Sequence, residues 1–187
     1  MTRTIIGLSG NLDRPSKTRT LVQRVVAAAA SEFQVTGTIY DLADFGPSLG
    51  AARRVADLDA PARAALDVIL SADALVVGSP VYKGSYTGLF KHLIDLIDPL
   101  ALAGKPVLLT ATGGGDRHAL VIEHQLRPLF GFFEAHALAT GVYASDRDFT
   151  DGQPASPALL DRIGRAVDQL APFVDRRALP EVFLLGA

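Results

Sequence analysis

The sequence predicts an α/β protein in which helices cover both faces of one parallel sheet, the doubly wound arrangement. Three observations predict this. Short apolar runs alternate along the chain with longer segments in which apolar residues recur every three or four positions. The short runs are apolar throughout, which is typical of parallel strands buried on both faces. The chain has 187 residues, enough for one sizeable core, so we expect a single domain over residues 1–187.

Five apolar runs predict five strands. The third run stops at Pro80, whose ring fixes φ and whose nitrogen has no hydrogen to donate to a neighbouring strand. In chain order, the expected strands cover residues 4–8, 35–40, 73–79, 106–112 and 136–143.

The longer segments between these runs predict five helices. One of them places Phe90, Leu93, Ile94 and Ile97 on a single helical face. In chain order, the expected helices cover residues 17–32, 60–71, 86–97, 118–134 and 157–174. The two long connections, rich in Asp, Gly, Pro and Ala, have the length that binding loops often have, and they cover residues 41–59 and 144–156.

The alternation of five strands with five helices predicts the flavodoxin-like strand order 2-1-3-4-5. The competing Rossmann order requires a sixth strand, which we do not find in the sequence. In open sheets of this kind, ligands bind beyond the carboxyl ends of the strands, at the point where the strand order reverses. The loops after the first, third and fourth strands are therefore the expected binding site.

Composition excludes several classes of function. Eighteen basic and twenty acidic residues give a formal net charge of −2, which argues against a nucleic-acid partner. The absence of cysteine excludes disulfides, thiolate metal sites and cysteine nucleophiles, and the four histidines lack the spacing of a zinc site. No apolar run approaches the roughly 18 residues of a membrane span, and we see no signal segment. We therefore expect a cytoplasmic protein without a membrane partner.

The loop after the first strand carries a hydroxyl-rich sequence around a lysine. It begins at Ser9 and enters the helix through Ser16, Lys17 and Thr18. Backbone N–H groups at a helix N-terminus bind phosphate, and hydroxyl and ammonium groups add further donors. The spacing matches neither GxxxxGK[ST] nor GxGxxG, which speaks against a small nucleotide kinase. We predict a site for a terminal phosphate; the alternative is an ordinary capped helix start with solvated cations.

The loops after the third and fourth strands suit a flat, polar ring such as flavin. Proline fixes the backbone of the first of these loops, and glycines in both loops let the backbone approach a ligand closely. The candidate residues are Pro80, Val81, Tyr82, Lys83, Gly84 and Ser85 in one loop and Thr112, Gly113, Gly114 and Gly115 in the other. The alternatives are a turn that packs on a neighbouring subunit and a flexible strand-to-helix connection.

Together the three loops resemble those of the NAD(P)H-dependent FMN reductase family, most closely the branch that supplies reduced FMN to sulfonate monooxygenases. The resemblance covers most of residues 4–143. It rests on RPSKTRTL (14–21), SPVYKGSYTGLFKHLIDL (79–96), GKPVLLTATGG (104–114) and HALVIEHQLRPLF (118–130). One departure is that the family often has Gly-Ser-Pro-Arg where this chain has Gly-Asn-Leu-Asp, at residues 10–13.

This resemblance implies cofactors, binding residues and a partner. The FMN phosphate would be held by Ser9, Ser16, Lys17 and Thr18. Residues 80–85 and 112–115 would line the isoalloxazine, and NADPH or NADH would deliver a hydride to it without a catalytic side chain. Reduced FMN would pass to a flavin-dependent monooxygenase of the alkanesulfonate or methanesulfonate type. Two alternatives stay open: a quinone, azo-dye or chromate reductase with tightly bound FMN, and a non-enzymatic flavodoxin-like electron carrier.

A proline interrupts the predicted helix 118–134. Because Pro128 has no N–H, the carbonyl of His124 loses its helical donor, and a local π-turn would let the N–H of Leu129 reach that carbonyl. The similar sulfonate-linked reductases carry a π-helical insertion in this helix, with Tyr or His at the position of His124. His124 lies off the apolar stripe, so it would face a partner subunit or the flavin edge.

Surplus apolar residues predict self-association. Leu89 and Leu96 lie outside the core stripe of their helix, and residues 182–185 form an apolar stretch near the C-terminus. We expect a homodimer or homotetramer, with the flavin near a subunit boundary and the tail at about residues 176–187 at the interface.

Overall fold

The core of the protein is a six-stranded parallel sheet. A computed structural model describes residues 3–175 of the chain. The strands lie in the order β2-β1-β3-β4-β5, which confirms the predicted order, and β6 pairs with β4 on the edge that β5 also occupies. The sheet strands are β1 (Thr4–Ser9), β2 (Thr36–Asp41), β3 (Ala74–Pro80), β4 (Pro106–Gly113), β5 (His136–Ala137) and β6 (Val142–Ser145).

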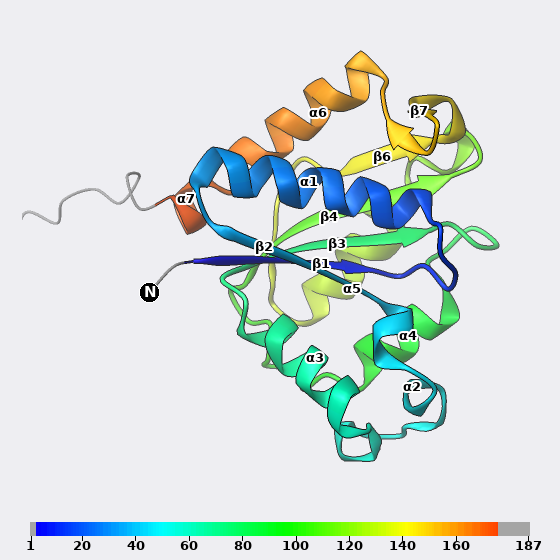
Figure 1. Cartoon of the computed structure of the whole chain (residues 1–187), viewed down its shortest axis with the longest axis vertical. Helices are drawn as coiled ribbons and strands as arrows, with labels where there is room; N and C mark the ends of the chain where they lie inside the picture. Colours follow the sequence, from blue (N-terminus) through cyan, green and yellow to red (C-terminus); the bar gives the residue numbers. More distant parts are fainter. Residues whose placement is uncertain (1–2, 176–187) are drawn as a thin grey trace, which may run out of the picture.

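Helices cover the sheet on both faces, as Figure 1 shows. α1 and α6 lie on one face, and α3, α4 and α5 lie on the other. The helices are α1 (Lys17–Phe33), α2 (Ser48–Ala51), α3 (Ala60–Ser71), α4 (Gly88–Asp95), α5 (Arg127–Phe132), α6 (Pro157–Asp168) and α7 (Ala171–Val174). Among residues 3–175, no helix combines the length and apolar character that crossing a membrane requires.

The two covered faces explain why the central strands are largely apolar, whereas β2 at the edge of the sheet is exposed over its first three residues. Successive side chains of a strand point to opposite faces. In β3, Leu75 and Val77 pack in the layer that contains Phe90 of α4, whereas Val76 packs in the layer that contains Val25 of α1. Every position of such a strand is therefore buried, and no polar alternation develops.

The predicted fifth strand is divided in two. Within residues 136–143, β5 ends at Ala137 and β6 begins at Val142. The N–H of Leu138 still donates to the carbonyl of Val107 in β4 at 2.9 Å. Other backbone groups of the intervening residues bond to side chains: Arg127 donates to the carbonyl of Leu138 at 2.9 Å, and the N–H of Thr140 donates to Gln169 at 3.0 Å. These two side chains replace part of the ladder that a continuous strand would make.

Three predicted helices differ from the structure at their ends or in their regularity. The helix expected over residues 86–97 is shorter and covers Gly88–Asp95. Within residues 118–134 the chain forms a π-helix (Ile122–Leu126) followed by α5, preceded by a 3-10 turn (Asp116–His118). Within residues 157–174, α6 ends at Asp168 and the short α7 follows. The two long connections also contain short elements. The first holds a 3-10 turn Leu42–Phe45, α2 and a 3-10 turn Val55–Asp57, and the second holds a 3-10 turn Asp146–Asp148 and the hairpin of β7 (Phe149–Thr150) with β8 (Gln153–Pro154).

The register of the sheet aligns the ends of the strands that the sequence singled out. Ser9, the last residue of β1, lies between Asp41 of β2 and Gly78 of β3. Pro80 at the end of β3 pairs with Thr112 of β4. The loops that follow β1, β3 and β4 therefore leave the sheet at one edge, side by side.

Candidate functional site

A pocket of about 440 Å³ opens at this carboxyl edge. Its size falls in the range that small-molecule sites occupy. All three predicted loops contribute to it, and a fourth segment from residues 144–149 completes it. Its lining residues are Asn11, Leu12, Asp13, Pro15, Ser16, Lys17, Thr18, Pro80, Val81, Tyr82, Thr112, Gly113, Gly114, Ala144, Asp146 and Phe149.

The first wall of the pocket is the N-terminus of α1. Ser16 is the N-cap, and its Oγ accepts a hydrogen bond from the N–H of Arg19 at 3.3 Å. The N–H groups of Lys17 and Thr18 belong to the first turn, where a helix supplies no acceptor. Ser16, Lys17 and Thr18 all line the pocket, so this wall presents N–H and hydroxyl donors together with the positive end of the helix dipole.

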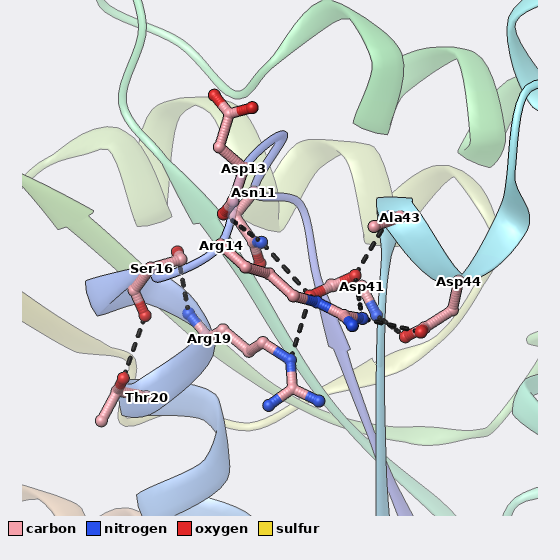
Figure 2. Close-up of polar contacts among 9 residues, drawn as sticks. All are labelled: Asn11, Asp13, Arg14, Ser16, Arg19, Thr20, Asp41, Ala43 and Asp44. Atoms are coloured by element: carbon pink, nitrogen blue, oxygen red, sulfur yellow. Dashed lines mark hydrogen bonds and ion pairs between the residues drawn. The ribbon is translucent and has the colours of Figure 1, made fainter.

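A buried carboxylate fixes the path of the loop that leads into α1, as Figure 2 shows. Asp41, at the end of β2, is fully buried. Arg14 donates to both of its oxygens, from Nε and Nη2, at 2.6 Å each, and Nη2 also reaches Asp44 at 2.7 Å. Nε of Arg19 lies 3.0 Å from Oδ2 of Asp41, an ion pair without hydrogen-bond alignment. Arg14 belongs to the loop, Arg19 belongs to the first turn of α1, and the carboxylate belongs to the sheet, so the cluster attaches the loop and the start of α1 to the sheet.

Asn11 connects this cluster to the pocket. Its side chain is almost fully buried, and its Nδ2 donates to the carbonyl of Asp13 at 3.0 Å and to Asp41 at 3.3 Å. Its Oδ1 is buried and has no hydrogen-bond partner among the residues that the structure describes. Asn11 therefore holds the loop through its amide nitrogen, and it is one of the residues that line the pocket.

The charge state of Asp41 follows from these contacts. Burial by itself raises the pKa of a carboxyl group, because it disfavours the charged form. At Asp41 the hydrogen bonds from Arg14 and Asn11 and the positive charge of Arg14 outweigh burial, so the pKa lies below its ordinary value. The pKa of Arg14 is raised, chiefly by its hydrogen bonds to Asp41 and Asp44. The pair is thus ionised at neutral pH.

The second wall is formed by Pro80, Val81 and Tyr82, of which Tyr82 is half exposed. Beyond Tyr82 the chain makes a two-residue hairpin turn. Tyr82 and Ser85 exchange backbone hydrogen bonds of 2.8 and 3.2 Å, while Lys83 and Gly84 between them have φ values of 53° and 86°. Positive φ at both central residues is typical of the turns that connect hairpin strands.

Two hydrogen bonds hold the hairpin turn, one with the third loop and one with the π-helix. The N–H of Val81 donates to the carbonyl of Thr112 at 2.8 Å, which joins the second loop to the third. Oγ of Ser85 donates to Oε1 of Gln125, in the π-helix, at 3.0 Å. Lys83, Gly84 and Ser85 do not line the pocket themselves, and they shape it by positioning Tyr82.

The third wall is the glycine-rich end of β4. Thr112, Gly113 and Gly114 line the pocket, and a buried hydrogen bond of 2.6 Å between the Oγ1 atoms of Thr112 and Thr18 joins this wall to the first. A Cβ atom on Gly113 would lie only 2.5 Å from the hydroxyl oxygen of Tyr143. Because that hydroxyl donates to the carbonyl of Gly115 at 2.6 Å, it cannot move aside freely. Glycine at position 113 is therefore a packing requirement of the site.

The surroundings of Tyr143 also raise the pKa of its hydroxyl. Burial raises the pKa of its hydroxyl, and the negative charges of Asp116, Asp146 and Asp148 raise it further. The hydroxyl therefore stays protonated and keeps its hydrogen bond to the carbonyl of Gly115 at physiological pH.

Besides Lys83, Gly84 and Ser85, two more predicted residues lie outside the pocket lining, Ser9 and Gly115. Ser9 is fully buried at the end of β1, and its Oγ has no hydrogen-bond partner among the described residues. Gly115 lies just beyond the third wall, where its carbonyl binds Tyr143. Direct contact of either residue with a ligand stays a prediction.

The fourth segment was missed by sequence reasoning. Ala144, Asp146 and Phe149 line the pocket from the connection after β6. Nζ of Lys17 forms an ion pair with Oδ1 of Asp146 at 2.8 Å and lies 5.6 Å from the centre of the Phe149 ring. The only signal in the sequence was the length and composition of the connection 144–156, which does not single out individual residues.

The irregular helix predicted from Pro128 is present. The π-helix covers Ile122–Leu126, and the N–H of Arg127 closes it by donating to the carbonyl of Ile122, five residues earlier. This bond lies upstream of the one expected between Leu129 and His124. His124 is exposed within the π-helix.

Comparison with known proteins identifies the family. The family model for NADPH-dependent FMN reductases matches residues 3–150. The chain belongs to this family. It is therefore an oxidoreductase that acts with NAD(P)H and FMN.

Relatives of this FMN reductase match over nearly their whole length. The NADH-dependent FMN reductase SfnF of Pseudomonas fluorescens is 47% identical over 94% of both chains. An NADPH-dependent FMN reductase of Pseudomonas aeruginosa is 47% identical over 93% of this chain and 94% of its own. Among solved structures, the apo form of the NADH:FMN oxidoreductase EMOB has a TM-score of 0.81 at 28% identity, covering 91% of this chain and 90% of that one. These likenesses agree with the flavodoxin-like fold.

Proposed function

We propose that this FMN reductase hands its reduced FMN to a flavin-dependent monooxygenase of the alkanesulfonate or methanesulfonate type. Support comes from the resemblance of residues 79–96 and 118–130 to the sulfonate-linked branch of the family, together with 47% identity to a reductase named SfnF. The observation that carries the proposal is an open pocket that joins a helix N-terminus to the glycine-rich loop.

The residues of the pocket fit FMN. The donors at the start of α1, from Ser16, Lys17 and Thr18, suit the phosphate. Asn11, which lines the pocket, fixes the path of the loop through its hydrogen bonds to Asp13 and Asp41. The close backbone approach at Gly113 and Gly114 suits a flat ring.

The ring would lie between two loops. We assign Pro80, Val81 and Tyr82 to one side of it and Thr112, Gly113 and Gly114 to the other. Ser9, Lys83, Gly84, Ser85 and Gly115 would support these contacts from behind. When bound, FMN accepts a hydride from NAD(P)H, and the protein supplies position and electrostatics. The side chains of the pocket bind and orient, and none is required to take up or release a proton.

A flavin-exchange assay tests the proposal. The purified chain is dialysed, and oxidation of NADPH and NADH is followed with and without added FMN. The proposal expects many turnovers that depend on added FMN, and transfer of reduced FMN to a sulfonate monooxygenase. Turnover that persists after dialysis without added FMN would favour a quinone, azo-dye or chromate reductase with tightly bound flavin. Binding of FMN without steady NAD(P)H oxidation would favour an electron carrier.

A homo-oligomer is part of the proposal. Phe132 is 69% exposed and Leu100 is 73% exposed. Phe132 lines an apolar cavity of about 510 Å³ between α4 and α5, together with Ile94 and Leu129. A second copy of the chain would cover this surface, because monomers rarely expose contiguous apolar patches. The tail at residues 176–187, which we predicted to lie at the interface, is outside the residues that the structure describes.

Light scattering tests the oligomer. At micromolar concentration the chain should behave as a dimer or tetramer, and Phe132→Ser should shift it toward the monomer. A monomeric parent chain would contradict this part of the proposal.

A further inference from the structure

We propose that Asp146 competes with the flavin phosphate for Lys17, and that this competition keeps FMN exchangeable. The inference rests on the proposed placement of the phosphate at the start of α1. Lys17 is the first residue of α1, and Asp146 is the first residue of the 3-10 turn after β6. Their ion pair of 2.8 Å bridges two walls of the pocket that are 129 positions apart in the sequence.

Every cation among residues 14–19, from the loop and the first turn of α1, is already paired with a carboxylate. Arg14 binds Asp41 and Asp44, and Arg19 lies against Asp41. Lys17 binds Asp146. The pocket lining itself contains one cation, Lys17, and two carboxylates, Asp13 and Asp146. An incoming phosphate therefore meets N–H and hydroxyl donors but no uncompensated cation among the residues that line the pocket.

Asp146 stands in the pocket lining independently of Lys17. The residues beside it are fixed by their own contacts: Ser145 donates from its N–H and its Oγ to Asp148, at 2.7 and 2.8 Å. Arg147 forms an ion pair of 2.6 Å with Asp116. Removing the charge of Asp146 should therefore leave the segment in place and free the ammonium group of Lys17.

The consequence is a specific effect on the phosphate. An incoming phosphate must displace the carboxylate from Lys17, and it then lies near a negative charge at the edge of the pocket. Both effects weaken the binding of FMN, whose phosphate carries a charge of about −1.5 to −2 at pH 7. Neither effect acts on riboflavin, which has no phosphate. Both side chains are about half exposed, so screening by solvent keeps the expected effect near tenfold.

Flavin binding to the dialysed chain tests this without relying on turnover. Quenching of flavin fluorescence gives the Kd of FMN and of riboflavin for the parent, Asp146→Asn, Lys17→Met and the double variant, at one ionic strength. Asp161→Asn is the matched control, because it removes one carboxylate from an exposed ion pair with Arg165, on α6 outside the pocket lining.

Asp146→Asn should lower the Kd of FMN about tenfold and slow FMN release in stopped-flow measurements, and it should leave the Kd of riboflavin unchanged. Lys17→Met should weaken FMN and leave riboflavin unchanged, and in its background the gain from Asp146→Asn should shrink. The control should match the parent for both flavins.

Two results would overturn the inference, and they differ from each other. If the parent prefers FMN over riboflavin and Asp146→Asn binds FMN no more tightly, the competition is wrong while the phosphate site stands. If Lys17→Met weakens FMN and riboflavin equally, or weakens neither, the phosphate does not bind at Lys17, and the proposed placement fails with the inference. Circular dichroism spectra that match the parent exclude misfolding as the cause.

Discussion

Gln125 accepts a hydrogen bond of 3.0 Å from the hydroxyl of Ser85, which joins the π-helix to the hairpin turn beyond β3. The two residues are 40 positions apart in the sequence. A π-helix inserts a residue into a helix and shifts the direction of the side chains around it, and such insertions are frequent at functional sites. Here the shifted segment contains the side chain that holds the turn carrying Lys83 and Gly84, next to Tyr82 of the pocket wall.

Gln125→Ala should loosen this wall. We expect the KM for FMN to rise about threefold to tenfold, in line with the loss of one hydrogen bond, while kcat changes little. Gln125→Glu keeps an oxygen that can accept from Ser85 and should restore most of the affinity. Steady-state kinetics over a range of FMN concentrations separate the two parameters. Equal KM values for the parent and the alanine variant would show that the bond does not position the wall.

Deleting His124 should convert the π-helix to a regular α-helix, because it removes one residue from the segment Ile122–Leu126. A π-segment costs stability, so its presence suggests a functional gain. We expect the deletion variant to retain more FMN after dialysis and to transfer reduced FMN to an acceptor protein more slowly.

His124→Ala is the matched control for this deletion, since it removes the imidazole and keeps the length of the segment. If the extra residue matters, only the deletion changes flavin retention. If the ring matters, both variants change it. Unchanged flavin content and NADPH:FMN turnover in the deletion variant would mean that the irregularity has no role in flavin exchange.

Asp41→Asn should destabilise the fold, because it leaves Arg14 and Arg19 beside a neutral, buried amide. Breaking a buried pair on one side is strongly destabilising, and since Arg14 is half exposed we expect a loss of about 2–4 kcal/mol. Urea unfolding at pH 7 measures it. Asp161→Asn, at an exposed pair on α6, should change the midpoint far less.

The same carboxylate predicts a pH dependence. The pKa of Asp41 in the folded protein lies below its ordinary value, so folding favours the charged form. Its contribution is fully present above the unfolded pKa of about 3.9 and is lost as the pH falls through the lower folded value. The difference in unfolding free energy between the parent and Asp41→Asn should therefore narrow below about pH 4. A constant difference across this range would show that charge is not the source of the stabilisation.

Most of the sheet could be predicted from the sequence because its central strands β1, β3 and β4 are mostly apolar and buried at nearly every position, and parallel pairing follows from that. The divided fifth strand could not, because the break depends on Arg127 and Gln169 taking over backbone hydrogen bonds. Neither side chain carries a local signal of this role.

The site shows the same contrast. Ser16 and Thr18 could be placed in the pocket from local sequence alone, because hydroxyl residues where a helix begins after a buried strand are typical of an anion site. Asp146 and Phe149 could not, because they enter the pocket only when the segment after β6 folds against α1. The role of Asn11 also required the structure, since its partner Asp41 lies on another strand.

Gly113→Ala tests how closely the third wall is packed. The added Cβ would lie 2.5 Å from the hydroxyl oxygen of Tyr143 and 3.3 Å from Cβ of His118. Overpacking of this kind costs about 1–3 kcal/mol, and displacement of the wall should also weaken FMN. Gly115→Ala is the control from the same segment, because a Cβ there has nothing within 4 Å and the backbone is extended.

A second substitution identifies the atom that causes the clash. Tyr143→Phe removes the hydroxyl and with it the hydrogen bond to Gly115, which should cost about 1 kcal/mol alone. Combined with Gly113→Ala, it should restore part of the lost stability, so that the double variant is more stable than the sum of the single effects predicts. Thermal unfolding of the four chains measures this coupling. Strictly additive losses would mean that the alanine is accommodated without contact to the hydroxyl, and that glycine at 113 serves the ligand rather than the packing.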